Sequence, residues 1–237
     1  MQILTLLPPR ILRPIVITPV SGRGLRALLI MTIIGLGLVT MRGVLTHNWW
    51  FFYMLCWNGA LAWFPLGVIL VLRDLLASRA LRSWMAGPFL LLWLVFLPNA
   101  PYIITDLFHI QHIQSPLLWF DTMTIFLFAV TGLLTGLYST LLVHRLVVQR
   151  AGTLLTWLCM LGCQVLSGFG IYLGRWIRLN SWDLLTTPAM LARAVYEALH
   201  NTLSLKLTII YGLVLAGLYI AFYLFSEDET RKKVKQA

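Results

Sequence analysis

The stretch WMAGPFLLLWLVFLPNAPYIITDLFHI, residues 84–110, joins a long apolar run to a polar motif that contains two prolines. Its first part is apolar and long enough to cross about 30 Å of hydrocarbon as a helix, which takes about 20 residues. Five further windows have the same character, so we predict an all-α, polytopic membrane bundle of about six transmembrane helices. The predicted spans lie near residues 25–41, 49–72, 84–105, 117–143, 153–174 and 203–225.

The composition excludes a water-soluble globule. Hydrophobic residues make up 59% of the 237-residue chain and charged residues 11%, and the mean hydropathy is +0.84. So few polar side chains cannot cover the surface of a soluble protein of this size. The net charge of +10 lies in short loops and tails and forms no basic stripe interleaved with aromatic residues, so we expect no nucleic-acid partner.

The distribution of basic residues predicts that both termini lie in the cytoplasm, because cytoplasmic loops carry the excess of lysine and arginine. We divide the chain into a Pro/Arg-rich cytoplasmic arm (1–24), a single transmembrane domain (25–225) and a charged cytoplasmic tail (226–237). In this orientation thirteen of the eighteen lysines and arginines lie inside. The outer segments hold Arg42, Arg175, Arg178, Arg193 and Lys206.

The first polar motif is LPNAPYIITDLFHI at 97–110. Pro98 and Pro101 disturb the helix near its outer end and leave backbone groups that need other partners. Asp106 and His109 are three residues apart, so a helical stretch would place them on one face, where they can hydrogen-bond or share a metal ion. The polar side chains of the motif are Asn99, Tyr102, Thr105, Asp106 and His109.

The second polar motif is WFD at 119–121, which places Asp121 about one turn inside the fourth span. A carboxylate at this depth costs about 1–3 kcal/mol unless it is paired or hydrated. We therefore expect a partner for Asp121, with Arg175 or His109 as the candidates.

The third polar motif is GFGIYLGRWIRLNSWD at 168–183, at the end of the fifth span. Arg175 and Arg178 are three residues apart and could form a fork for a phosphate or a carboxylate. Asn180 and Asp183 supply hydrogen-bonding groups beside them. The outer ends of spans three, four and five reach one surface, so the three motifs can meet there.

Each motif also has a plain structural interpretation. Asp106 with His109 can be a helix-end hydrogen bond, Asp121 can form a structural bridge, and the two arginines can anchor to lipid head groups. The pairs Gly132 with Gly136 and Gly170 with Gly174 each form a GxxxG pattern, which we interpret as close helix packing. The long segment 175–202 could be a lid or a docking surface for a protein partner.

The motifs LPNAPYIITDLFH, WFD and GIYLGRWIRLNSWD resemble the bacterial multi-pass membrane family known as domain of unknown function 1361. The likeness covers roughly residues 45–225 and implies a location in the bacterial cytoplasmic (inner) membrane. The family has no established activity. The resemblance supports a characteristic set of polar positions: Asn99, Tyr102, Asp106, His109, Asp121, Arg175, Arg178, Asn180 and Asp183.

Three classes of function stay open from the sequence. In the first, an enzyme or lipid-handling site binds an anionic head group through Asn99, Tyr102, Arg175, Arg178, Asn180 and Asp183. Asp106, His109 and Asp121 are then the candidate acid–base groups, or the ligands of a divalent metal ion, although no familiar zinc signature is present. The second class is a small-solute transporter or channel with a broken third helix. The third is a structural or accessory protein that contacts membrane lipids and docks a partner on its outer loops. The oligomeric state is not predicted.

Overall fold

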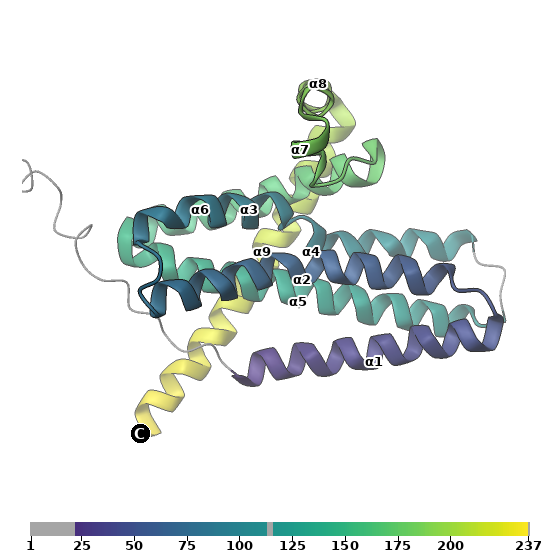
Figure 1. Ribbon diagram of the computed structural model, residues 1–237, viewed down its shortest axis with the longest axis horizontal. Coiled ribbons are helices and arrows are strands. Elements are labelled where there is room, and N and C mark those ends of the chain that lie inside the picture. The colour runs from purple at the N-terminus through teal and green to yellow at the C-terminus, as the bar shows by residue number, and fades with distance from the viewer. Residues whose placement is uncertain (1–21, 113–115, 237) are drawn as a thin grey trace, which may run out of the picture.

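The computed structural model describes residues 22–112 and 116–236, and within them the chain is helical with no strand (Figure 1). The elements are α1 (Gly22–Thr46), α2 (Trp50–Ala77), η2 (Ser83–Ala86), α3 (Gly87–Phe96), α4 (Asn99–Tyr102), η3 (Ile103–His112), α5 (Leu118–Ala151), α6 (Thr153–Tyr172), η4 (Leu173–Ile177), α7 (Asp183–Thr186), α8 (Pro188–Leu199) and α9 (Thr202–Gln236).

Six helical segments are long and apolar enough to cross a membrane, which confirms the predicted number of spans. The first span is longer than expected, because α1 covers the whole of Gly22–Thr46. The third is a composite of η2, α3, α4 and η3 over Trp84–Phe108. Large apolar side chains such as Ile33, Leu154 and Leu213 are exposed on the spans, as expected where helices face lipid. The chain is therefore a multi-pass membrane protein.

Of the two predicted terminal segments, the structure describes the C-terminal one almost completely and the N-terminal one only at its end. Most of the expected arm, 1–24, lies outside the described residues. The expected tail, 226–237, continues α9 as helix to Gln236.

Helix α5 forms the centre of the bundle. In its apolar window 72% of the residues are buried, against 17% to 33% in the other five spans. It packs against α1, α2, α4, η3 and α6, and its small residues let these neighbours approach closely. The side chains that define the candidate site are therefore positioned around α5.

The proline break at α4 fits between two glycine pairs, which bears out their packing role. A Cβ atom on Gly132 would lie 2.6 Å from the Ala100 carbonyl oxygen, and one on Gly136 would lie 2.8 Å from Ala100 Cβ. On the other side, a Cβ on Gly170 would overlap the Pro98 ring, and one on Gly174 would lie 3.1 Å from the Tyr102 ring. The two GxxxG pairs hold the broken third span against α5 and α6.

A buried cluster of aromatic side chains lies where α5, α6 and α9 meet. His144 Nδ1 lies 2.7 Å from the Tyr219 hydroxyl oxygen, and both side chains are almost fully buried. The rings of Trp157 and Tyr223 lie 4.9 Å and 4.8 Å from the imidazole, measured between ring centroids. This cluster joins three spans through one hydrogen bond and aromatic packing.

The segment 175–202, predicted as a long loop, contains two short helices. The π-helical turn η4 ends span five, and Arg178 follows it with φ of 64°, in the left-handed region. Helices α7 and α8 come next, and Figure 1 shows α8 nearly end-on beyond the end of α6, with its axis across those of the long helices. The segment therefore covers the end of span five.

Candidate functional site

A buried carboxylate lies at the meeting point of three elements. Asn58 of α2 donates from Nδ2 to Asp106 Oδ2 at 2.7 Å, and Arg175 Nη1 of η4 lies 3.4 Å from Asp106 Oδ1. Asp106 belongs to η3 and its side chain is 1% exposed. A charge so buried is stable only with such partners. We call Asn58, Asp106 and Arg175 the Asp106 cluster.

A pocket of about 320 Å³ lies beside this cluster and shares Asn58 with it. Its walls come from α2, α3, α4, α6 and the segment after α6. Most of the lining is apolar, and the polar side-chain groups of the lining residues are three amides, two hydroxyls and the indole N–H of Trp57. The lining residues are Trp57, Asn58, Leu61, Val95, Pro98, Asn99, Tyr102, Gly170, Leu173, Gly174, Leu179, Asn180, Ser181, Leu184, Leu191 and Val195.

Hydrogen bonds fix the segment after η4 to the third span. Asn99 Nδ2 donates to the Phe96 carbonyl and to Ser181 Oγ, both at 3.0 Å. Ser181 Oγ in turn donates to the Val95 carbonyl at 3.2 Å. Because Asn99 and Ser181 also line the pocket, these contacts shape one of its walls.

Asp183, predicted to bind substrate, makes contacts within its own segment. Its Oδ2 accepts a hydrogen bond of 2.7 Å from the Asn180 backbone N–H, and its Oδ1 accepts one of 3.3 Å from the Thr186 hydroxyl. Asp183 therefore closes the turn into α7. The turn engages only the backbone N–H of Asn180, which is itself a lining residue of the pocket.

The predicted fork of Arg175 and Arg178 depended on a helix continuing through both residues. The helix instead ends at Ile177, and Arg178 takes the left-handed conformation. Arg175 pairs with Asp106, whereas the Arg178 side chain is exposed. Neither arginine lines the pocket.

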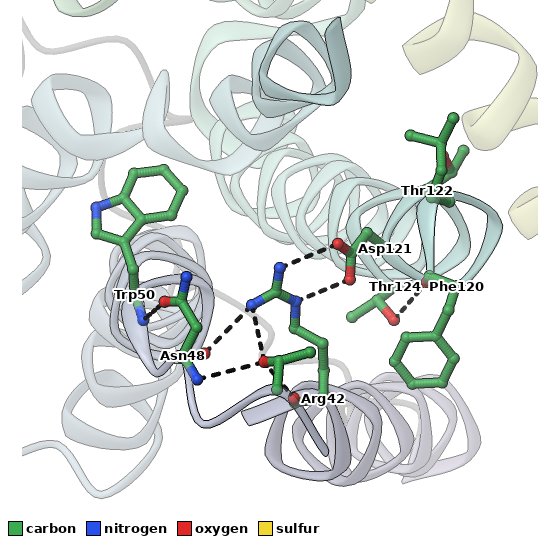
Figure 2. Close-up of polar contacts among 9 residues, drawn as sticks. Arg42, Asn48, Trp50, Phe120, Asp121, Thr122 and Thr124 are labelled. Carbon is green, nitrogen blue, oxygen red and sulfur yellow. Dashed lines mark hydrogen bonds and ion pairs between the residues drawn. The ribbon is translucent and has the colours of Figure 1, made fainter. Parts of the chain in front are cut away.

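Asp121 pairs with Arg42, which corrects the prediction of Arg175 or His109 as its partner. Figure 2 shows the guanidinium of Arg42 facing the carboxylate, with Nε 2.9 Å from Oδ1 and Nη2 3.1 Å from Oδ2. Arg42 Nη1 also donates to the Asn48 carbonyl at 3.2 Å, and its Cζ lies 4.2 Å from the centroid of the Phe51 ring. Arg42 lies inside α1 rather than in an outer loop, so the C-terminal part of α1 reaches the start of α5. This bidentate pair joins the two helices.

The family model described as "Protein of unknown function (DUF1361)" matches residues 57–218. The chain belongs to this family. No curated protein and no solved structure matches it. Every residue that lines the pocket lies inside the DUF1361 match, as do Asp106, Asp121 and Arg175, whereas Arg42 lies outside it.

The structure of this DUF1361 chain brings some of the predicted chemical groups together and separates others. Asp106 meets Arg175, and Asn99, Tyr102 and Asn180 share the pocket. Asp121 is engaged by Arg42. The side chain of His109 lies outside the described part, and among the described side chains no three histidines, cysteines or acids are grouped as metal ligands. Metal binding by Asp106, His109 and Asp121 stays a prediction, as do their acid–base roles.

Two site residues of the DUF1361 chain were missed from the sequence. Asn58 lies alone in the apolar run of the predicted span 49–72, and none of the three polar motifs includes it. A lone amide in a transmembrane helix is itself a signal, because it needs a partner inside the bundle. Trp57, interpreted as part of the apolar span, lines the pocket and lies 5.8 Å from Trp182 between ring centroids.

Proposed function

We propose that the protein binds an amphipathic, lipid-type molecule in the pocket between α2, α4, α6 and α8. The supporting observation is that the pocket lining combines apolar and polar side chains. Leu61, Leu173 and Leu191 offer an apolar surface for a hydrocarbon chain, while Asn58 and Asn180 offer hydrogen bonds to a polar head. Ligand sites in proteins combine these two features, an apolar wall and a few placed polar groups.

Helix α8 supports a location of the pocket at the membrane–water boundary. Leu191 and Val195 of α8 line the pocket and Ala198 is buried, whereas Arg193 and Glu197 are exposed and paired at 2.9 Å. An amphipathic helix of this kind lies in the plane of the interface. A lipid-type molecule in the adjacent leaflet would then reach the pocket without leaving the membrane.

The same proposal places the pocket on the outer face of a bacterial cytoplasmic membrane. The excess of basic residues in the loop after α2, at the C-terminal end of α5 and at the C-terminus supports a cytoplasmic location for that end of the bundle. The pocket lies at the opposite ends of spans three and five.

Asp106 acts in this account as a positioning residue. It is absent from the lining, yet it accepts the hydrogen bond that orients Asn58. Binding is therefore the function that the geometry supports best, and Asp106 contributes by fixing one of the hydrogen-bonding groups.

Native mass spectrometry of the purified protein tests this function. We expect wild-type protein to retain one lipid-type molecule through delipidating detergent washes. Val195→Trp should reduce the retained fraction at least fivefold, because the larger side chain enters the pocket. Ala192→Trp is the matched control, since Ala192 is exposed on the same helix and does not line the pocket. Equal retention by both variants would contradict the proposal.

A further inference from the structure

The polar part of the pocket is uncharged. The polar groups of its residues are the amides of Asn58, Asn99 and Asn180, the hydroxyls of Tyr102 and Ser181 and the indole N–H of Trp57, and no charged residue is among the described lining residues. Proteins recognise phosphate and carboxylate heads with arginine, lysine or clustered backbone N–H groups. A lining of neutral amides and hydroxyls fits a neutral head group better.

The orientation of Asn58 presents an acceptor. A carboxylate can only accept a hydrogen bond, so the Asn58 amide nitrogen faces Asp106 Oδ2 at 2.7 Å. Asn58 then keeps its own oxygen Oδ1, an acceptor, and one N–H for other partners. An anionic phosphate or sulfate carries acceptors alone and cannot donate to the Asn58 oxygen. A hydroxyl of a ligand can donate to it.

Two more groups of the lining have free hydrogen-bonding capacity. Within the described residues, neither the Tyr102 hydroxyl nor the side-chain amide of Asn180 has a hydrogen-bond partner in the protein, while both residues line the pocket. The amide and the hydroxyl can each donate and accept. Adjacent hydroxyl groups of a ligand, which also donate and accept, match this pattern.

Aromatic rings complete the match. Trp57 lines the pocket and is 56% exposed, and it meets Trp182 edge to face. The negative face of an aromatic ring attracts the weakly positive C–H groups that a sugar ring presents on its flat side. Amides beside an open aromatic surface therefore suit a ring that carries both hydroxyl and C–H groups.

The charges nearest to the pocket do not favour an anion. Arg175 is paired with Asp106, so together they add no net charge. Arg178 adjoins the lining residue Leu179 in the chain, but its side chain is exposed and outside the lining. An anionic head would have to depend on Arg178.

From these observations we infer that the pocket binds the uncharged, polyhydroxylated head, of sugar type, of an amphipathic molecule. This inference rests on the proposed function and names its ligand class. Asn58, Tyr102 and Asn180 hydrogen-bond the hydroxyl groups, Trp57 packs against the ring, and the apolar lining takes the start of the hydrocarbon chain.

The test is titration calorimetry of the full-length protein in lipid nanodiscs with three probes of equal chain length, each below its critical micelle concentration. The probes are octyl glucoside, octyl phosphate and octyltrimethylammonium. We expect octyl glucoside to bind at least tenfold more tightly than the other two. Asn180→Ala should weaken its binding about threefold to tenfold, because this change removes the side-chain amide and keeps the backbone N–H that Asp183 holds. Arg178→Gln should leave it unchanged.

Tighter binding of octyl phosphate, lost in Arg178→Gln, would overturn the inference in favour of an anionic head. Equal binding of all three probes, reduced in Val195→Trp, would overturn it and leave the proposed lipid site standing. If no probe bound wild-type protein more tightly than Val195→Trp, both the inference and the proposed function would fail.

Discussion

The side-chain amide nitrogen of Asn58 lies 2.7 Å from Asp106 Oδ2, and this hydrogen bond connects the pocket to a buried ion pair. It joins α2 to η3 across the bundle, because the two residues are 48 positions apart in the chain. Because the Asp106 carboxylate can only accept, it fixes the Asn58 nitrogen toward itself and so sets the direction of the Asn58 oxygen.

Changing Asp106 to asparagine should weaken ligand binding, although the two side chains have nearly the same shape. The new amide can donate to Asn58 as well as accept from it, so the orientation of Asn58 is no longer specified. We expect the affinity for octyl glucoside to fall at least fivefold, measured by titration on the monodisperse folded fraction. Asp183→Asn, which alters the acceptor of the Asn180 backbone N–H, should have a smaller effect. Unchanged affinity in Asp106→Asn would contradict the positioning role.

Breaking the Arg42–Asp121 pair should destabilise the protein strongly. Both side chains are at most 8% exposed, and removing one partner of a buried ion pair costs about 3–5 kcal/mol. Arg42→Met should therefore lower the melting temperature in detergent, and Arg42→Met with Asp121→Leu should recover part of the loss. Arg193→Ala, which removes an exposed pair, should change stability by less than about 1 kcal/mol. A melting temperature in Arg42→Met equal to that of Arg193→Ala would refute this account of the pair.

The glycines that hold α4 should not tolerate alanine. In Gly132→Ala the new methyl group would meet the backbone oxygen of Ala100, which cannot move without shifting α4. We expect a loss of about 1–3 kcal/mol and a fall in melting temperature. Gly162→Ala is the matched control, because nothing lies within 4 Å of that position and alanine favours a helix by about 0.5–1 kcal/mol over glycine. If both variants behaved alike, the close packing of α4 on α5 would be wrong.

The contact between His144 and Tyr219 should contribute modestly to stability. Tyr219→Phe keeps the ring packing and removes the hydroxyl that lies 2.7 Å from His144 Nδ1. Hydrogen bonds between membrane helices contribute about 0.6 kcal/mol on average and up to about 1.7 kcal/mol. A small fall in thermal stability is expected, while Tyr53→Phe, at an exposed position, should have no effect. A gain in stability in Tyr219→Phe would speak against this hydrogen bond.

The proposed orientation predicts which loops a membrane-impermeant thiol reagent can reach. After replacement of Cys56, Cys159 and Cys163 by alanine, Thr187→Cys in the pocket segment should be labelled in intact cells. Ala80→Cys, in the loop after α2, should be labelled only after permeabilisation. Both positions are exposed in the structure, so a difference in labelling reports the side of the membrane and not burial within the protein. The reverse pattern would invert the topology.

The number and approximate positions of the spans follow from the sequence, because each helix that faces lipid keeps a long apolar run. The packing role of the glycine pairs was also predictable, since close helix contact requires small residues at fixed spacing. The partner of Asp121 was not. Arg42 is 79 positions away, and their contact depends on how α1 is rotated and shifted against α5, which hydropathy does not specify.

The pocket residues were predictable in part. Asn99, Tyr102 and Asn180 stand out as polar groups at span ends, and all three line the pocket. The expected arginine fork required a helix that continues through Arg178. The π-helical turn ends at Ile177, and Arg178 follows it at positive φ, so the two arginines are not one helical turn apart. Asn58 lines the pocket and contacts Asp106, and the order of residues in the chain reveals neither relationship.

Photo-crosslinking in the native membrane can identify the molecule that occupies the pocket. A benzoylphenylalanine replaces Leu191, which lines the pocket, or Leu154, which is 75% exposed on the lipid-facing side of α6. Mass spectrometry then identifies the captured molecules. We predict one predominant amphipathic species with an uncharged, hydroxyl-rich head at position 191 and the bulk phospholipid mixture at position 154. The same mixture at both positions, or no lipid at position 191, would contradict the account.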